Sequence, residues 1–296
     1  MFGKERAETE ALAIISDGHV NSTVALCPKK VNRDDGGTYY PSRGQVALRE
    51  SFQDFCDSFG RVKADRKIGL INGDAADLGG GNGRSSQLIS TNPATIKKAT
   101  ISAYEPFFAV IDDLYVIRGT PFHSGVSSWI EEWLADDIDI AVPFSIDEEE
   151  LDEFGKPKKK IASWWHLQKT CQGVKFDIKH QGNMGRLPWT QKHAALRLVE
   201  QNLWHYKITK GIEAPDVIVR SHVHKYAADF ENYPTAGIFT PCWSLITEYA
   251  YHRNMENDTA TIGGIWFKCS EGKYEYKKLI YEPKDEREIW VVDTEL

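Results

Sequence analysis

The sequence has little that would place the protein in a membrane or in an oxidising compartment. No window approaches the ~20 consecutive apolar residues of a membrane-spanning helix, and the opening MFGKERAETE lacks the apolar core of a secretory signal. The 5 cysteines are widely spaced and form no C-x-x-C pair, so neither a disulfide framework nor a thiolate zinc site is indicated. We therefore expect a cytoplasmic protein with reduced, buried cysteines and no membrane partner.

Positive charge is also scarce. Lys and Arg total 36 against 43 Asp and Glu, which gives a formal net charge of -7. Non-specific duplex binding depends on many cations that neutralise phosphates, so this balance argues against such binding, though a local basic patch stays open. With 41% hydrophobic and 27% charged residues in 296, the composition is that of a globular protein with a sizeable core. It does not indicate an oligomeric state.

The chain does contain strand-like runs that each end near an aspartate or a histidine. They are AIIS before Asp17 and His19, GLIN before Asp74, LYVIRG before Thr120 and His123, VKFDIK before His180, and DVIVRS before His222 and His224. Open α/β folds collect their sites at the carboxyl ends of strands. We therefore expect these side chains, which are far apart in the sequence, to meet at one edge of a sheet.

Segments of helical period alternate with these runs. Apolar residues recur every three or four positions around 48–59, 96–107 and 196–206, and each stripe could cover a sheet face. The alternation predicts a layered α/β fold with a largely parallel or mixed central sheet. After His224, the runs TAGIFTPCWSLI, IGGIWFKCS and KYEYKKLIYE predict a second sheet packed on the first, with a hairpin turn at Glu271-Gly272.

Residues 137–165 break this alternation. An acidic run at 147–153 is followed by a turn at 154–157 and by three lysines at 158–160. We interpret the segment as a hairpin arm inserted in a single domain that spans residues 1–296. Opposite charges paired across its two strands explain the run better than a nucleic-acid contact, because a charge run alone is a weak sign of binding.

The residues at the strand ends are carboxylates and imidazoles without thiolate, a set that suits manganese, iron, zinc or nickel. Two aspartates and four histidines are too many for one catalytic ion with open positions, but they suffice for two ions if one carboxylate bridges. Two ions ~3.5–4 Å apart polarise phosphoryl oxygens and turn a water into hydroxide near neutral pH. The pattern therefore predicts a hydrolase of phosphoesters.

Taken in order, these motifs also carry a resemblance. The set D-G-H, G-D-A-A-D, G-T-P-F-H, H-Q-G and S-H-V-H resembles the signature of the calcineurin-like metallophosphoesterases, which runs D-x-H, G-D-x-x-D, G-N-H, H and G-H-x-H. The later T-P-C-W segment and the G-T-x-x-H form are similar to the branch found in bacteriophage and prophage genomes, for which the location would be the host cytoplasm. The resemblance implies a four-layer fold, with two mixed β-sheets packed as a sandwich and flanked by helices.

The resemblance also implies a role for each ligand residue. The first metal would be bound by Asp17, His19 and His224, and the second by His180 and His222, with Asp74 bridging both. Manganese is the expected ion at both positions, with iron, zinc or nickel as alternatives. Asp77 would orient a ligand from outside the ligand set, or else cap a helix.

His123 and Thr120 depart from the family pattern. His123 would take the part of the family's non-ligand histidine, which protonates the leaving oxygen or stabilises the transition state, yet it lies two residues later than expected. Thr120 replaces the asparagine of G-N-H, and a hydroxyl is a poorer neutral ligand than an amide carbonyl, so the second metal would be held more weakly or would gain a water instead. Ser221 replaces the glycine of G-H-x-H.

Three arginines fall near the ligand positions and would grip non-bridging phosphate oxygens: Arg118, Arg186 and Arg220. Arg118 and Arg220 lie within strand runs, so a structural ion pair is the alternative for either. The function that we expect is a two-metal phosphodiesterase acting on nucleic acid or nucleotides by metal-hydroxide attack, with the substrate taken by analogy from a phage-like setting. The alternatives are a phosphomonoesterase or protein phosphatase, and a degenerate metal-binding module without turnover.

Overall fold

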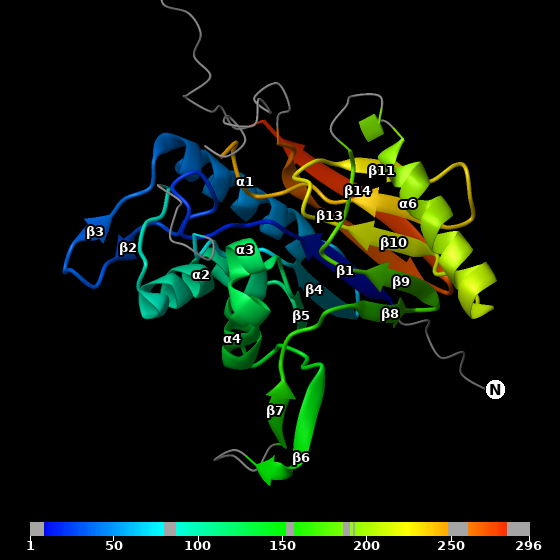
Figure 1. The fold of residues 1–296 in the computed structure, drawn as a ribbon, viewed down its shortest axis with the longest axis horizontal. Helices are drawn as coiled ribbons and strands as arrows, with labels where there is room; N and C mark the ends of the chain where they lie inside the picture. The colour runs from blue at the N-terminus through cyan, green and yellow to red at the C-terminus, as the bar shows by residue number, and fades with distance from the viewer. Residues whose placement is uncertain are drawn as a thin grey trace, which may run out of the picture.

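A computed structural model describes residues 9–79, 87–151, 157–185, 190–191, 193–247 and 260–282. Two mixed five-stranded sheets form its centre (Figure 1). The first sheet has the order β14 (Lys273–Tyr281), β13 (Ile262–Ser270), β1 (Glu10–Ile15), β4 (Arg66–Asn72) and β5 (Asp113–Ile117). The second has the order β11 (Ala227–Asp229), β12 (Ala236–Phe239), β10 (Val217–Arg220), β9 (Val174–Ile178) and β8 (Leu167–Cys171). All five runs predicted to end at the site are strands of these sheets.

Helices and two small ribbons complete the described chain. The helices are α1 (Arg43–Gly60), α2 (Pro93–Phe108), α3 (Pro121–Ser124), α4 (Trp129–Asp137) and α6 (Ala194–Leu203), with a 3₁₀ turn η1 (Val126–Ser128) and a π-helical segment η2 (Trp204–Lys210). The ribbons pair β2 (Val31–Asn32) with β3 (Thr38–Tyr39), and β6 (Ser145–Leu151) with β7 (Pro157–Ile161). Among the described helices, none combines the length and the apolar character needed to cross a bilayer.

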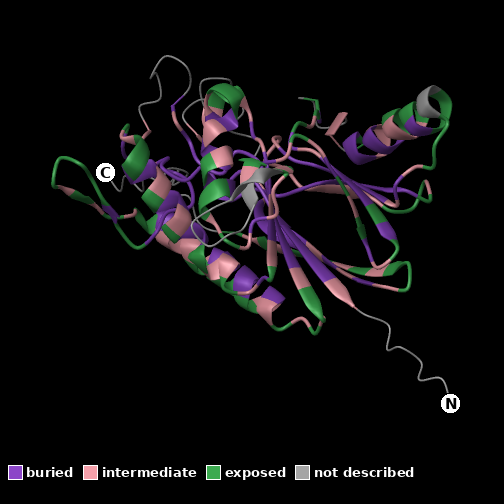
Figure 2. Ribbon diagram, turned by 90° about the horizontal axis from the view of Figure 1, so that it is seen from below, coloured by how far each residue is buried: buried purple, intermediate pink, exposed green. Residues whose placement is uncertain are grey.

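Alternation along β1 shows how the layers form, because successive side chains of a strand point to opposite faces. Ala11, Ala13 and Ile15 pack with the cluster formed by α1, α2 and α4, whereas Leu12 and Ile14 pack with the second sheet. On the far side, α6 covers the second sheet through contacts such as Leu198 with the cluster around Ile218. Figure 2 shows the buried residues along the strands between these outer helices. The expected sandwich of two mixed sheets flanked by helices is confirmed.

Helix α1 illustrates the local causes. Ser42 and Gln45 form a capping box at its start, and the predicted stripe at 48–59 is fully buried against the first sheet. Phe52 packs edge-on against Trp243 with ring centroids 4.9 Å apart, so a residue of the T-P-C-W segment becomes part of this core. All 5 cysteines are free and buried, as the sequence predicts.

The strands near the end of the chain correct one prediction. We expect from the sequence that IGGIWFKCS and KYEYKKLIYE join a second sheet, but β13 pairs antiparallel with β1 and therefore extends the first sheet. The hairpin turn at Glu271-Gly272 is present between β13 and β14. The edge of β1 opposite β4 needs a partner for its backbone groups, and periodicity alone cannot show which later strand fills it. Of the predicted late runs, only the one containing β12 lies in the second sheet.

The stripe predicted at 196–206 is also shifted. The buried face of α6 carries Ala195, Leu198 and Val199, while Leu196 is only half-buried. At Trp204 the chain passes from α-helical to π-helical turns, so the period of 3.6 on which the prediction rests no longer applies.

The β6–β7 hairpin projects away from the sheets (Figure 1). Its register places Asp147 opposite Lys158. Lys159 has another role, because its Nζ donates to the carbonyls of Ala135, Asp136 and Ile138 at 2.7, 3.1 and 3.0 Å. These carbonyls lie at the C-terminal end of α4, where a cation offsets the helix dipole. One lysine of the basic run therefore anchors the hairpin to α4.

Candidate metal centre

The ligand-type residues follow strands of both sheets. Asp17 lies two residues after β1 and Asp74 two residues after β4, in the first sheet; His180 and His222 stand at the same offset after β9 and β10, in the second. The carboxyl ends of these parallel strands lie at one edge of the sandwich. The structure therefore brings together residues that the sequence separates by as many as 205 positions, as for Asp17 and His222.

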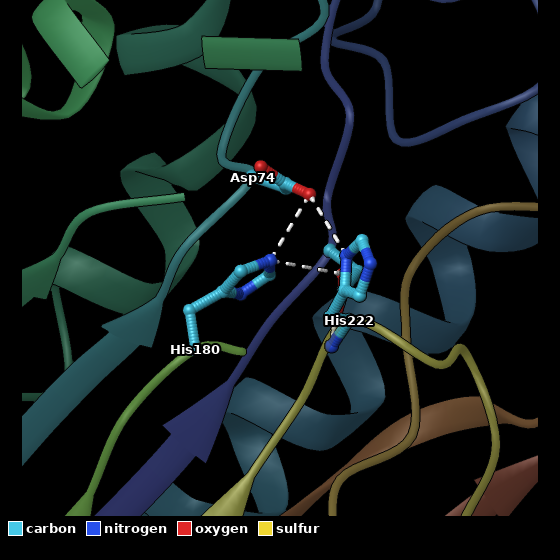
Figure 3. A group of neighbouring side chains, drawn as sticks. Asp74, His180 and His222 are labelled. Atoms are coloured by element: carbon cyan, nitrogen blue, oxygen red, sulfur yellow. Dashed lines mark hydrogen bonds and ion pairs between the residues drawn. The ribbon is translucent and has the colours of Figure 1, made fainter. Parts of the chain in front are cut away.

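One group consists of Asp17, Asp74, His180 and His222, whose ligand atoms all lie within 4.8 Å of one another. Figure 3 shows one carboxylate oxygen of Asp74 facing both imidazoles. Nε2 of His180 is 3.0 Å from Oδ2 of Asp74 and 3.9 Å from Oδ1 of Asp17. Nδ1 of His222 is 3.8 Å from Oδ2 of Asp74. Two carboxylates and two imidazoles thus face one small volume.

A second group consists of Asp17, His19 and His224. Nε2 of His19 is 3.0 Å from Nε2 of His224, which is 3.5 Å from Oδ1 of Asp17. Asp17 is therefore the carboxylate common to both groups, whereas the resemblance gives the bridging position to Asp74. Variants at these two positions distinguish the arrangements.

These groups fit divalent cations. Buried polar atoms nearly always have hydrogen-bond partners, but Oδ1 of Asp17 and Nδ1 of His19 are buried without one. Nδ1 of His180 donates to the carbonyl of Asn72 at 2.6 Å, an arrangement that orients a ligating imidazole and leaves Nε2 for the ion. Together with the donor set, these features favour a borderline transition metal.

The pKa shifts of the centre favour the protonation state that a ligand needs at Asp17, Asp74 and His19, but they favour the protonated form at His180. Burial would raise the pKa of Asp17, but the charges of His180 and His224 outweigh burial and hold this pKa well below its usual range. The pKa of Asp74 is lowered against burial in the same way, mainly by His180. Burial lowers the pKa of His19 to about 3. For His180 the nearby carboxylates outweigh burial and raise the pKa to about 9.

The backbone at the ligands is unusual. The φ angles are positive at Asp17 (50°), His19 (41°), Asp74 (48°), His222 (74°) and His224 (55°). This left-handed region is disfavoured for residues with a Cβ and concentrates at functional sites. Next to Asp74, a side chain at Gly73 would collide with the ring of His180, and Gly73 itself has a φ of 78°. Both the left-handed backbone and the close approach of the His180 ring therefore favour glycine at position 73.

Thr120 reaches the centre through Asp74. Its backbone N–H donates to Oδ1 of Asp74 at 2.6 Å, and its hydroxyl lies 3.1 Å from each oxygen of that carboxylate. A Cβ at the preceding Gly119 would overlap the same carboxylate. The hydroxyl is therefore engaged with Asp74, and its expected place as a metal ligand stays a prediction.

His123 lies beside the second group. Its ring centroid is 4.3 Å from that of His19, and its Nδ1 is 3.5 Å from Oδ1 of Asp77. Oδ1 of Asp77 also accepts from the N–H of Gly79 at 2.8 Å. These three side chains, His19, Asp77 and His123, form a further group of potential ligand atoms. The later position of His123 along the chain does not keep it from the centre, because α3 turns it back.

The arginines occupy different surroundings. Arg220 is buried, and its Nη2 is 2.8 Å from Oδ1 of Asp177. Arg118 donates to Ser163 at 2.8 Å and to Glu132 at 3.0 Å. Structural ion pairs, which the sequence left open for both, therefore engage these guanidinium groups, and phosphate binding by either stays a prediction. Arg186 lies outside the described residues.

Sequence reasoning missed the hydroxyls that surround the centre. Ser16 and Ser221 each lie 2.7 Å from the hydroxyl of Thr240, and Asn72 donates to Ser221. Ser221 stands where the family has glycine, and it uses its hydroxyl to join strands of the two sheets. Its environment could not be anticipated, because Ser221 and its three partners lie at the ends of four different strands.

It also missed Ser124 and Glu131. The hydroxyl of Ser124 lies 3.2 Å from Oδ1 of Asp74 and 2.6 Å from Oε1 of Glu131. One signal was available: Glu131 stands next to Ile130 and three residues before Leu134, on the buried side of a short helical stripe. A glutamate in such a position needs a polar partner inside the protein.

No family model and no curated protein matches the chain. Among solved structures, Vps29 from Entamoeba histolytica is similar at 10% identity and a TM-score of 0.39, covering 92% of this chain and 99% of that one. Protein TM1076 from Thermotoga maritima is similar at 13% identity and a TM-score of 0.36, with the same coverage of 92% and 99%. The sulfate thiohydrolase SoxB from Thermus thermophilus is similar at 9% identity and a TM-score of 0.40, covering 94% of this chain and 58% of that one. At identities of 9–13% and TM-scores of 0.36–0.40, these similarities do not indicate a function.

Proposed function

We propose that the protein is a phosphoester hydrolase that uses two divalent metal ions and acts as a phosphodiesterase on nucleic acid or nucleotides. The convergence of Asp17, Asp74 and four histidines at one edge of the sandwich carries this proposal. The ordered motifs that resemble the calcineurin-like metallophosphoesterases support it. Ions bound there would polarise the phosphoryl group and acidify a water.

The chain's own residues have distinct parts in this proposal. The two groups that share Asp17 would hold the ions, with manganese as the expected metal. His123 would donate a proton to the leaving oxygen, and Asp77, 3.5 Å from its Nδ1, would orient the ring for that transfer. Thr120 and Ser124 would keep the carboxylate of Asp74 in place through their hydroxyls.

An exposed aromatic residue supports a nucleotide substrate. Phe122 is 57% exposed, and its ring centroid lies 4.8 Å from that of His123. An exposed ring beside the proton donor could stack on a nucleobase, and such stacking tolerates any base sequence. A phosphomonoester without an aromatic group would gain nothing from this contact.

The test combines metal binding with ester hydrolysis. With manganese, the parent should release nitrophenol from bis(nitrophenyl) phosphate faster than from nitrophenyl phosphate, because the proposed activity is that of a diesterase. Asp74→Asn should bind less manganese and lose nearly all activity, since an amide does not neutralise a cation. His205→Ala removes an exposed histidine of η2 and serves as the matched control, with parental rates and metal content.

The same variants distinguish the two bridging arrangements. If Asp74 bridges, Asp74→Asn should weaken both ions, whereas Asp17→Asn should do so if Asp17 is shared, as the grouping suggests. His224→Ala should chiefly weaken the first ion and His180→Ala the second. Parental rates in all four variants with excess manganese would mean that the ligand assignment is wrong.

A metal-binding module without turnover is the second candidate. The observation that favours it is that Thr120, which replaces an amide ligand, directs its hydroxyl to Asp74. Such a module would bind manganese, and the ligand variants would weaken this binding as described above, but the protein would hydrolyse neither ester. Turnover of the monoester in preference to the diester would instead favour a phosphomonoesterase.

A further inference from the structure

The first turn of helix α4 carries two consecutive glutamates that point to different parts of the molecule. Glu131 is fully buried beside the metal centre, where Oε1 accepts from the N–H of Ala75 at 3.1 Å and contacts Ser124. Glu132 instead accepts from the N–H groups of Ala162 and Ser163 at 2.7 and 3.0 Å, at the base of the β6–β7 hairpin. A substitution of Glu131, beside the metal centre, can therefore be compared with one of Glu132, which lies in the same helix but contacts the hairpin.

The contacts of Ser124 constrain the chemistry of Glu131. A serine hydroxyl has one hydrogen, yet Ser124 lies between Oδ1 of Asp74 at 3.2 Å and Oε1 of Glu131 at 2.6 Å. If that hydrogen went to Glu131, the oxygen of Ser124 would face Asp74 with lone pairs only. If Glu131 supplies a hydrogen to Ser124, the hydroxyl is free to donate to Asp74 and every contact is satisfied.

We propose that Glu131 is a positioning residue of the metal centre, which holds Ser124 so that its hydroxyl donates to the Asp74 carboxylate. The inference rests on the proposed metal centre, because the consequence of fixing Asp74 is a preformed site for an ion. Glu131 also fixes the backbone next to Asp74 through Ala75. Partners that orient a ligand in this way are worth about 10–100-fold in metal affinity.

Two further facts support this role. Oε2 of Glu131 is buried without a hydrogen-bond partner, an arrangement that is costly for a carboxylate and much less so for a neutral acid. Burial, with Asp74 as a nearby negative charge, raises the pKa of Glu131 to about 7. A merely structural glutamate would be expected to find a cation or several donors instead, as Glu132 does with Arg118.

The experiment measures manganese affinity by calorimetry on folded variants, with the free energy of unfolding measured in parallel. Glu131→Leu and Ser124→Ala should each weaken manganese binding by about 10–100-fold. Glu131→Gln should lose less, since an amide can still hold either Ser124 or Ala75. Glu132→Gln, which disturbs the base of the hairpin, should keep the parental affinity. Because Glu131 acts through Ser124, the double variant with Glu131→Leu and Ser124→Ala should bind manganese about as weakly as Glu131→Leu alone.

The outcomes separate this inference from the proposed function. If the parent binds manganese and Glu131→Leu and Ser124→Ala bind it equally well, the inference is overturned and the centre stands. Equal losses in Glu131→Leu and Glu132→Gln would also overturn it, because the effect would then belong to the stability of α4. If Glu131→Leu does not fold, Ser124→Ala decides alone. A parent that binds no manganese overturns both.

Discussion

At the scale of single residues, His123 gives the sharpest test of mechanism. It contacts His19 and Asp77 but lies outside both groups that share Asp17. If it protonates the leaving oxygen, His123→Asn should keep the parental metal content and slow esters with poor leaving groups by ~10²–10⁴. Nitrophenyl esters, whose leaving group needs little protonation, should be affected less. Rates on alkyl and nitrophenyl diesters check this.

His205→Asn is the matched control for that experiment, because it makes the same substitution at an exposed histidine of η2. It should leave the ratio of alkyl to nitrophenyl rates unchanged. An equal loss on both kinds of ester in His123→Asn would contradict proton donation and point to phosphate binding. Loss of metal would instead identify His123 as a ligand in its group with His19 and Asp77.

The residues of the centre differ in how far the sequence could predict them. The six strand-end residues were predictable because the sequence shows both where the apolar runs end and which residues at those ends can bind a metal. The structure does bring these six residues together. Glu131 and Ser124 were not predictable, since the contacts of Ser124 with Asp74 and Glu131 depend on how α4 packs against β5 and α3. Arg220 shows the reverse: its position beside a ligand suggested phosphate binding, but Asp177 of β9 engages it across the sheet.

At the scale of secondary-structure elements, α4 makes the stability of the protein depend on pH. Burial raises the pKa of Glu131 in this helix to about 7 from the ordinary 4.5. Between these pH values the folded state keeps a proton that the unfolded state has lost, so stability falls as pH rises from 4.5 to 7 and then levels off. The total is about 3 kcal/mol, at about 1.4 kcal/mol per pKa unit.

Glu131→Gln should remove this pH dependence. Relative to the parent, the metal-free variant should gain stability steadily from pH 4.5 to 7 and keep a constant advantage above pH 7. Urea unfolding of both proteins in chelator, at intervals across this range, measures the difference. Glu132→Gln serves as the control, because Glu132 has a lowered pKa despite partial burial and should not show this rise. Parallel curves for parent and Glu131→Gln would contradict the prediction.

Elements were predictable where one face is buried and the period holds. The stripes at 48–59 and 96–107 became α1 and α2, and five apolar runs became strands. The pairing of the strands was harder to predict from the sequence, since it depends on which strand edges stay unpaired after the rest of the sheet has formed. For this reason β13 pairs with β1 in the first sheet. The second sheet, which we predicted from the runs after His224, is formed by strands β8 to β12.

At the scale of the whole molecule, the candidate centre joins the two sheets. Asp17 and Asp74 follow strands of the first sheet, and His180 and His222 follow strands of the second. An ion held by all four would resist separation of the sheets, so metal binding should stabilise the fold. Manganese at a hundredfold excess over its Kd should add about 2.7 kcal/mol to the free energy of unfolding.

Thermal unfolding with manganese and with chelator checks this. The parent should unfold at a distinctly higher temperature with manganese, and Asp74→Asn should show little difference between the two conditions. An unchanged Tm in the parent at saturating metal would contradict a centre that spans both sheets. A shift of the same size in Asp74→Asn would mean that manganese binds elsewhere.

The left-handed backbone at the ligand positions bears on how such a chain diverges. Glycine adopts this conformation at less steric cost than histidine or aspartate, so at these five positions the residue that binds metal is not the residue that fits the backbone best. A duplicated copy relieved of its catalytic duty would gain stability by the very substitutions that erase the ligands. Each such substitution would also make it less favourable to regain the lost ligand, so loss of the centre would be difficult to reverse in evolution.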